Sequence, residues 1–394
     1  MRSLNFNIIL IFIISISYSS QFDFVYKNNN LNQYIFNYEN YKKNIELLNN
    51  YNNTQDEFID EEIPSLDPSF FYQHNGEIII KIDSFKCNIL KGNPTFIIPP
   101  KLDIKYEANI RNNKIHNISI NPIMENDTIK LEYDIIYFTI EEINNDLLNN
   151  NFPVSRMFTN ITNELTINDS RDVSSFYQNP AILYITGGNS ASSPYFQDLI
   201  NLKVKKGFVV YNVSTAEIGS NNASDIKEYI QNAYNSYNPP PEFICLVGDD
   251  GGSYDIPSFR ESISGYFGEG DHPYTLLEGD DIISDILIGR ISARTQDHLN
   301  TIINKIIKYE SASFLNIPNF DNSWIERAAL VSDPYPSGNS TIITNQYISE
   351  TILEAGFEEV VTNFGENNYD LWMLESINSG ISFLNYRGWW GVSG

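Results

Sequence analysis

The chain has 394 residues, enough for about two to three domains, and 42% of them are hydrophobic, so it can bury sizeable cores. The formal net charge of -25 argues against nucleic-acid binding, because proteins of that class need a basic face to neutralise phosphates. The same acidity is compatible with oxygen-rich cation sites, although most carboxylates of such a chain form a solvated surface.

Residues 1–19 have the pattern of a signal peptide. Arg2 precedes an apolar run over 8–16, and Ser17 and Ser19 supply small residues at a cleavable spacing. The run is too short for a bilayer span, and no later stretch is long and apolar enough to be one. We therefore expect a secreted or cell-surface protein with no membrane span after cleavage; the alternative is an uncleaved anchor.

Two segments precede the main domain. Residues 20–75 are rich in Asn, Tyr and charge and contain few sustained apolar patterns, which predicts a poorly ordered or loosely docked leader. Over 76–174, short alternating runs such as 77–82 and 130–137 are separated by Gly and Pro turns. They predict a β-rich accessory or pro-module, most simply a sandwich.

From 175 to 394 the pattern changes to alternating strands and helices. Ser193-Pro194 supplies an N-cap and a first-turn proline for the first helix. Apolar runs predict strands at 181–186, 208–213, 243–247, 286–291, 328–331, 358–361 and 381–386. This succession predicts an α/β fold with a mostly parallel sheet flanked by helices, and chemistry at the carboxyl ends of its strands.

The sequence contains only two cysteines, Cys87 and Cys245, which excludes a disulfide framework. Cys245 lies inside the apolar run 243–247, and a free cysteine in such a run usually behaves as a small hydrophobe. We interpret it as a core residue.

An acidic loop precedes the strand at 286–291. Asp281, Ile283 and Asp285 alternate there, so two carboxylates and a backbone carbonyl could surround a hard cation such as Ca²⁺. Asp249 follows a neighbouring strand and is expected to supply a third carboxylate. The alternative is an acidic hairpin exposed to water.

The final segment, 385–394, leads from a strand into a Gly-rich turn, a common place for an active-site loop. Ser393 does not match the strand-to-helix elbow of serine hydrolases. A serine or metal hydrolase is disfavoured because the chain shows neither a triad nor clustered histidines.

Several ordered motifs in the second half resemble the gingipain-type cysteine peptidases of family C25, from about Ile182 to the end of the chain. The segments that carry this resemblance are Phe243–Asp249, Asp255–Pro257, Gly279–Asp285, Ile288–Ser292 and Gly380–Gly388.

The resemblance implies a caspase-like domain of an exported cysteine endopeptidase that hydrolyses peptide bonds in protein or peptide substrates. It also implies structural Ca²⁺ at the acidic loops, with side-chain ligands from Asp249, Asp281 and Asp285 and backbone carbonyls from Glu278 and Ile283. The acidic partner of the family's catalytic histidine matches Asp333.

One departure from the family concerns the catalytic pair. Trp389 occupies the position of the family's histidine, and an indole cannot accept a proton as a general base. The family's cysteine lies beyond this point, whereas Cys245 lies upstream on a different strand. We therefore expect no proteolysis by this polypeptide alone, whether it is part of a longer enzyme or a degenerate domain.

The alternative function is a non-catalytic exported protein-binding or secretion module, with Trp389 and Trp390 on its binding face.

Overall fold

The computed structural model describes residues 22–28, 31–39, 42, 68–145, 152–168, 176–263, 266–312, 321–365 and 368–388. The chain divides into two compact units. Unit 1 comprises 1–38 and 67–313, and unit 2 comprises 39–66 and 314–394. The predicted signal peptide lies outside the described residues.

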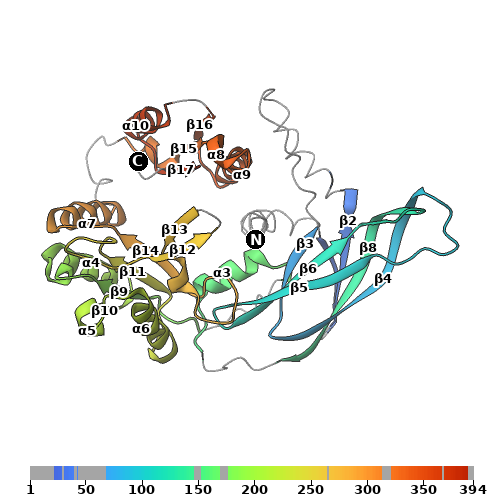
Figure 1. Ribbon diagram of the computed structural model, residues 1–394, viewed down its shortest axis with the longest axis horizontal. Helices are drawn as coiled ribbons and strands as arrows, with labels where there is room; N and C mark the ends of the chain where they lie inside the picture. Colours follow the sequence, from blue (N-terminus) through green and yellow to red (C-terminus); the bar gives the residue numbers. More distant parts are fainter. Residues whose placement is uncertain are drawn as a thin grey trace. The chain divides into compact units, whose positions relative to one another are not determined.

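The N-terminal part of unit 1 is a β-rich module of two antiparallel sheets (Figure 1). One has the order β1-β2-β8-β4, with β7 also on β8; the other has the order β3-β6-β5. Its strands are β1 (Phe22–Asn28), β2 (Leu31–Asn37), β3 (Ser69–Gln73), β4 (Gly76–Lys91), β5 (Lys101–Ile110), β6 (Asn113–Asn121), β7 (Ile123–Glu125) and β8 (Lys130–Asn145).

Aromatic side chains join the two sheets face to face. The rings of Phe70 and Phe138 lie 5.7 Å apart, and those of Tyr34 and Tyr72 lie 6.2 Å apart. Each pair takes one ring from each sheet, so the core of the module lies between them, as in a sandwich.

The predicted leader, 20–75, differs from the structure at both of its ends. β1 and β2 belong to the first sheet, and β3 pairs with β6. Asn32, Tyr34 and Phe36 are all buried on one face of β2. This period of two marks a half-buried strand, and surrounding asparagines obscured it in the sequence.

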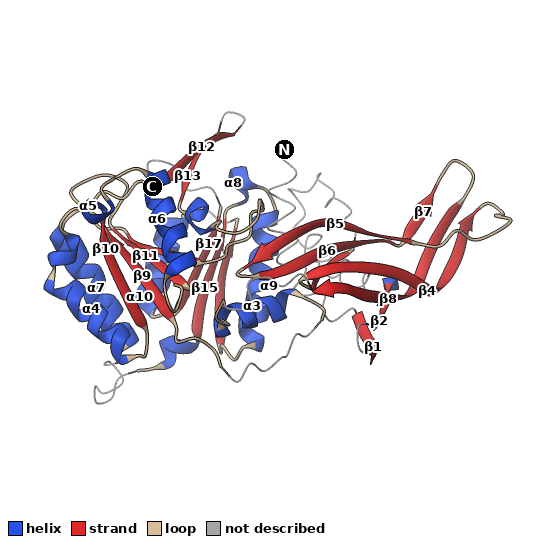
Figure 2. Cartoon of the chain, turned by 90° about the horizontal axis from the view of Figure 1, so that it is seen from below, coloured by secondary structure: helices blue, strands red, loops and turns tan. Residues whose placement is uncertain are grey.

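The second part of unit 1 contains a parallel sheet with the order β10-β9-β11-β14. Helices α4 and α7 cover one face and α6 covers the other (Figures 1 and 2). The elements are β9 (Ala181–Thr186), α4 (Pro194–Lys205), β10 (Val209–Ser214), α5 (Thr215–Ile218), α6 (Ala223–Ser236), β11 (Phe243–Val247), β14 (Leu287–Ile291) and α7 (Gln296–Glu310). A short hairpin, β12 (Phe259–Ile263) and β13 (Tyr266–Gly270), precedes β14.

Side chains that alternate along the strands contribute to the hydrophobic clusters on both faces of this sheet. On β11, Ile244 and Leu246 pack with α6, whereas Val247 packs with α4 and α7. The helices begin where the sequence provides caps: the Asn222 side chain accepts a hydrogen bond from Ser224 N at 2.8 Å, and Thr295 accepts one from His298 N.

A third cluster joins the β-rich module to this layer. Helix α3 (Arg156–Leu165) contributes Phe158 and Leu165, the β5–β6 hairpin contributes Ile110 and Ile115, and the loop before β14 contributes Ile283. The module and the parallel sheet therefore share a core within unit 1.

Unit 2 contains a second parallel sheet with the order β16-β15-β17. Its elements are β15 (Arg327–Ser332), α8 (Pro334–Ser337), α9 (Ser340–Glu354), β16 (Glu359–Phe364), α10 (Tyr369–Ser379) and β17 (Phe383–Arg387). The central strand, β15, is buried from Ala328 to Ser332.

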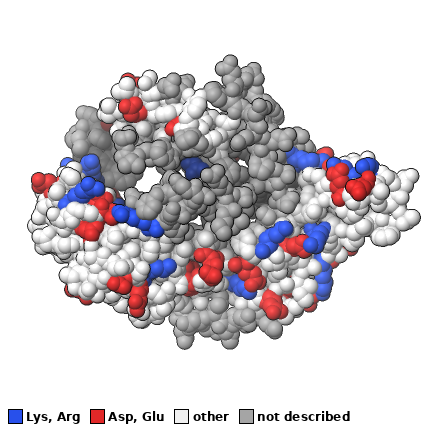
Figure 3. All heavy atoms as spheres, viewed as in Figure 1, with Lys and Arg blue, Asp and Glu red and all other residues white. Residues whose placement is uncertain are grey.

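The predicted fold class, helices around a mostly parallel sheet after a β-rich module, is confirmed. The parallel strands form two sheets, one in each unit. On the face shown in Figure 3, acidic and basic side chains of the described residues occur in small mixed groups. None of the helices within the described ranges has the length and apolarity needed to cross a bilayer.

Candidate active-site edge and acidic loop

Asp333 lies at the carboxyl end of β15, in the position expected for a functional side chain of a parallel sheet. Its carboxylate accepts hydrogen bonds from Tyr335 N at 2.9 Å and from the Tyr386 hydroxyl at 3.2 Å. Its own amide donates to the Arg387 carbonyl at 2.8 Å. Asp333 is therefore held both by the turn that opens α8 and by the end of β17.

Two tyrosines near Asp333 remain protonated at neutral pH. Burial, and then the charge of Asp333, raises the pKa of Tyr369 to about 12, and the same causes raise the pKa of Tyr386. The rings of the two tyrosines meet edge to face with centroids 6.5 Å apart. The carboxylate thus lies beside hydroxyl groups that can donate to it.

A buried amide network fixes the same sheet edge. Asn345 of α9 donates to the Val331 carbonyl at 2.7 Å and to the Ser332 hydroxyl at 2.9 Å. Asn385 of β17 donates to the Asn345 side-chain oxygen at 2.6 Å. Sequence reasoning missed Asn345, because one asparagine in a helix carries no signal of its distant partners.

Gly388 allows the end of β17 to lie against Asp333. A Cβ atom at this glycine would be 2.7 Å from the Asp333 Cβ and 2.8 Å from the Tyr386 hydroxyl. Trp389, which the resemblance predicts to replace the histidine, and Trp390 lie outside the described residues.

Cys245 lies on β11 in unit 1, against the cluster shared with α4 and α7. Burial raises the pKa of its thiol to about 12, so the thiol is protonated at neutral pH. The structure supports the interpretation of Cys245 as a core residue.

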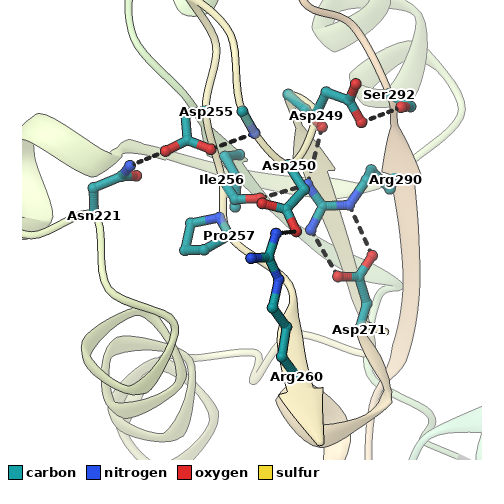
Figure 4. A network of polar contacts seen from close by, with 12 residues as sticks. Asn221, Asp249, Asp250, Asp255, Ile256, Pro257, Arg260, Asp271, Arg290 and Ser292 are labelled. Atoms are coloured by element: carbon teal, nitrogen blue, oxygen red, sulfur yellow. Dashed lines mark hydrogen bonds and ion pairs between the residues drawn. The ribbon is translucent and has the colours of Figure 1, made fainter. Parts of the chain in front are cut away.

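Asp249 follows β11 at the carboxyl edge of the unit 1 sheet (Figure 4). One carboxylate oxygen accepts from the Ser292 hydroxyl at 2.6 Å, and the other accepts from Arg294 Nε at 2.6 Å. Partial burial alone would raise the pKa of Asp249, but these two donors hold it below its ordinary value.

Arg290 of β14 braces the same edge. Its guanidinium forms two hydrogen bonds with Asp271, at 2.7 and 2.8 Å, and donates to the carbonyls of Gly248 and Ile256 (Figure 4). A planar guanidinium suits this fork geometry, so Arg290 ties the loop after β11 to the loop after the β12–β13 hairpin.

The acidic loop, residues 278–285, binds the turn between β5 and β6. Asp281 accepts from Asn109 N at 2.8 Å, and Glu278 accepts from Asn112 N at 2.6 Å. Asp285 accepts from Arg111 N at 3.1 Å. Three carboxylates of the loop therefore receive three backbone amides of the hairpin.

Asp285 is the most buried of these acids, with none of its surface exposed. Its second oxygen accepts from the amides of Leu277 and Glu278, at 2.8 and 2.7 Å. Burial raises the pKa of the carboxyl group to about 7, and the three amide donors oppose that shift. Asp281 also accepts from the Ile283 amide at 2.8 Å, which closes the loop on itself.

The structure brings Glu278, Asp281, Ile283 and Asp285 into one loop but does not bring Asp249 to them. In the parallel pairing of β11 with β14, Phe243 lies opposite Leu287 and Val247 opposite Ile291. Asp249 therefore follows the carboxyl ends, whereas the acidic loop precedes the amino end of β14. At about 3.3 Å per residue, a five-residue strand separates the two edges by roughly 16 Å.

The predicted set of five ligands consequently does not fit one calcium ion. Within the described ranges, no group of three or more His, Cys, Asp and Glu side chains is arranged to hold a metal ion. Calcium binding itself stays a prediction. Asp249 does not join the acidic loop, because Asp249 follows β11 whereas the loop precedes β14, and the two strands run parallel.

Comparisons with known proteins match the second half of the chain. The family described as peptidase family C25 matches residues 176–394. Lys-gingipain W83 of Porphyromonas gingivalis is 29% identical over 232 residues, which cover 55% of this chain and 12% of the relative. Gingipain R2 of Porphyromonas gingivalis is 25% identical over 208 residues, which cover 50% of this chain and 27% of the relative.

A solved structure, of the Arg-specific cysteine proteinase gingipain R, is similar with a TM-score of 0.44 and 22% identity, over 55% of this chain and 49% of that one. The matched region spans 12% of one of these curated relatives and 27% of the other.

Proposed function

Because the chain belongs to peptidase family C25, we propose that it is an exported gingipain-like cysteine endopeptidase domain that does not hydrolyse peptide bonds as this polypeptide alone. The observation that carries the peptidase assignment is the family match over 176–394, more than half of the chain. Protein or peptide substrates follow from that class. The signal-peptide pattern of residues 1–19 supports export.

The proposed inactivity rests on the chemistry of the thiols. A cysteine peptidase needs a thiolate and a neighbouring general base. Burial raises the pKa of both Cys87 and Cys245, and Trp389 stands where the family has its histidine. Asp333 keeps the place of the acidic partner, but the group that it would assist is an indole.

Alkylation kinetics test this proposal. The intact protein is treated with iodoacetamide at pH 7.5, labelling is followed by mass spectrometry, and hydrolysis of fluorescent casein is measured in parallel. We expect Cys245 to react about a hundredfold more slowly than an ordinary thiol, because the scarcity of its thiolate outweighs the greater nucleophilicity of a more basic thiolate.

A Cys87→Ser variant leaves Cys245 as the single thiol, and the urea-unfolded chain shows its unhindered rate. Rapid labelling of the native chain that also abolishes measurable proteolysis would show that this polypeptide is a competent peptidase.

A binding function is the second candidate, and an apolar surface of unit 2 favours it. Leu371, Leu374 and Ile377 of α10 are each more than half exposed, and Phe383 and Leu384 at the start of β17 are also exposed. Exposed apolar groups of this kind often mark protein-binding surfaces. If this surface binds a partner, cross-linking of the wild-type protein in the culture medium should yield a cross-link between α10 and another protein. The same cross-link should be absent from Leu374→Asp, and an unchanged cross-link in that variant would contradict a binding function.

A further inference from the structure

Several asparagines of the chain match the acceptor pattern for N-linked glycans, Asn-x-Ser or Asn-x-Thr with x other than proline. The pattern occurs at Asn52, Asn117, Asn126, Asn160, Asn168, Asn212, Asn222 and Asn339. Such glycans are bulky surface groups of exported proteins, so an acceptor asparagine must also be accessible in the folded chain. The structure separates two of these asparagines on that ground, Asn117 and Asn126.

Asn126 lies in the exposed turn between β7 and β8. Its side-chain oxygen accepts hydrogen bonds from Thr128 N at 3.0 Å, from the Thr128 hydroxyl at 3.1 Å and from Ile129 N at 2.9 Å. Within the part of the chain that the structure describes, no group bonds to Nδ2 of Asn126. The turn therefore fixes the carboxamide by its oxygen and leaves exposed the nitrogen that would carry a glycan.

Thr128 supplies the hydroxyl that the acceptor pattern requires two residues after the asparagine. A donor to the carboxamide oxygen withdraws electron density from the amide, which makes the Nδ2 protons more acidic. Loss of one of these protons accompanies any bond that Nδ2 forms to carbon. Position and chemistry thus both favour modification at Asn126.

Asn117 has the same pattern in a place that cannot carry a glycan. It lies on the central strand β6, between Phe71 of β3 and Tyr106 of β5, and only 3% of the residue is exposed. Its Nδ2 is buried and bonds to no other described residue. An oligosaccharide on this nitrogen would have to displace close-packed neighbours, so a chain modified there could not form the sandwich.

An exposed apolar surface lies in the same part of the β-rich module, at the end remote from α3 (Figure 2). The apolar tip, as we name it, consists of exposed side chains in β4 and in the loop that follows it: Ile89, Leu90, Phe96, Ile97 and Ile98. Phe96 is the most exposed of them, at 72%. A run of consecutive exposed apolar residues such as 96–98 is uncommon on a soluble protein unless the run has a function.

Contacts bring the apolar tip to the turn that carries Asn126. A Cβ atom at Gly92 would lie 2.3 Å from the Thr128 carbonyl oxygen, so the loop after β4 touches this turn. The Tyr133 hydroxyl donates to the Ile98 carbonyl at 2.5 Å and lies 3.9 Å from the Met124 sulfur of β7. A bulky, polar group on Asn126 would therefore stand beside the apolar tip and shield it from other proteins.

We propose that Asn126 carries an N-linked oligosaccharide that covers the apolar tip of the β-rich module. The modification requires that the chain is exported, as proposed above. Nδ2 of Asn126 forms a bond to the anomeric carbon of an oligosaccharide carried on a polyprenyl diphosphate. The bond from that carbon to the diphosphate oxygen breaks, the lipid diphosphate leaves, and one amide proton goes to solvent.

Mass spectrometry tests the proposal by comparing two asparagines in one peptide. Trypsin cuts after Lys114 and Lys130, so the peptide 115–130 contains both Asn117 and Asn126. The protein is recovered from the cells that make it and from their medium, digested, and treated with a peptide-N-glycosidase in water enriched in heavy oxygen. This enzyme converts a glycosylated asparagine into labelled aspartate. We expect the label at 126 in most copies and no label at 117.

Three variants separate the acceptor from the hydroxyl that supports it. Asn126→Gln removes the acceptor, and Thr128→Ala keeps Asn126 but removes the hydroxyl. Thr128→Ser keeps a hydroxyl and is the matched control. We expect the label at 126 to be lost in the first two variants and retained in the third. Both unlabelled variants should also bind more of a hydrophobic fluorescent dye, and adding Phe96→Asp should remove the excess.

An unlabelled Asn126 in protein from the medium would overturn the proposal and leave export standing. A chain that keeps residues 1–19, stays in the cells and carries no label would overturn both export and the glycan. Label at 117 as well as 126 would refute the selection of Asn126 by exposure. Unchanged dye binding in Asn126→Gln would refute coverage of the apolar tip.

Discussion

Tyr234 offers a direct measure of how strongly the acidic loop is bound. Its hydroxyl donates to Glu278 Oε1 at 2.6 Å, while its ring faces the Arg111 guanidinium. Tyr234→Phe removes the hydroxyl and keeps the ring. Hydrogen bonds to charged groups contribute about 1.5–3 kcal/mol, so we expect the variant to lose about 2 kcal/mol of unfolding free energy.

Tyr229→Phe is the matched control on the same helix. The Tyr229 hydroxyl bonds with the Tyr237 hydroxyl at 2.7 Å, a pair of neutral groups worth about 1 kcal/mol. In a double-mutant cycle, Tyr234→Phe and Glu278→Gln should show a coupling of about 1–2 kcal/mol, because the first variant removes the bond and the second removes the charge that strengthens it.

Urea unfolding provides the assay, since the two units can be followed separately. All four tryptophans, at 324, 372, 389 and 390, lie in unit 2, so their fluorescence reports on that unit. Tyrosine fluorescence and far-ultraviolet circular dichroism include unit 1, where the change should occur. A loss in Tyr234→Phe no larger than that in Tyr229→Phe, or a coupling near zero, would refute the argument.

Two further predictions concern unit 1. Gly248→Ala should destabilise unit 1 by about 3 kcal/mol in urea unfolding, because the new Cβ would lie 1.9 Å from the Tyr254 carbonyl oxygen. Gly289→Ala on β14 is the control and should be nearly neutral, because no atom lies within 4 Å of its new Cβ. Equal losses of stability in the two variants would contradict this reasoning. If calcium binds the acidic loop, as the sequence predicts, millimolar calcium should raise the thermal midpoint of unit 1, because a ligand that binds the folded state stabilises it. Asp281→Asn should abolish the rise, and an unchanged midpoint in the wild-type protein would contradict the calcium prediction.

The parallel layers were predictable because their strands are short apolar runs and their helices start at recognisable caps. The run 243–247 became β11, and Ser193-Pro194 marked the start of α4. These signals are local, since periodicity and capping depend on neighbours within a few residues.

The contacts of the candidate sites were not predictable in the same way. Asp249 and Asp285 both border strands, but the direction of the chain puts them at opposite edges of one sheet. Arg111 lies more than a hundred residues from Tyr234 and Pro241, and nothing near it in the sequence indicates that it contacts them. Such long-range pairings arise only from the packing of the whole unit.

The two edges of the parallel sheet in unit 1 have different partners: the β5–β6 turn contacts the amino edge, and the loops that follow the strands lie at the carboxyl edge. Arg111 is bound at the amino edge, whereas Asp249 and Arg290 organise the loops at the carboxyl edge. Loops at the second edge can therefore change in length and sequence without loosening the module at the first. Substitutions at the two edges should therefore accumulate independently. The loops at the carboxyl edge can diversify in sequence while the amino edge keeps its contacts with the β-rich module.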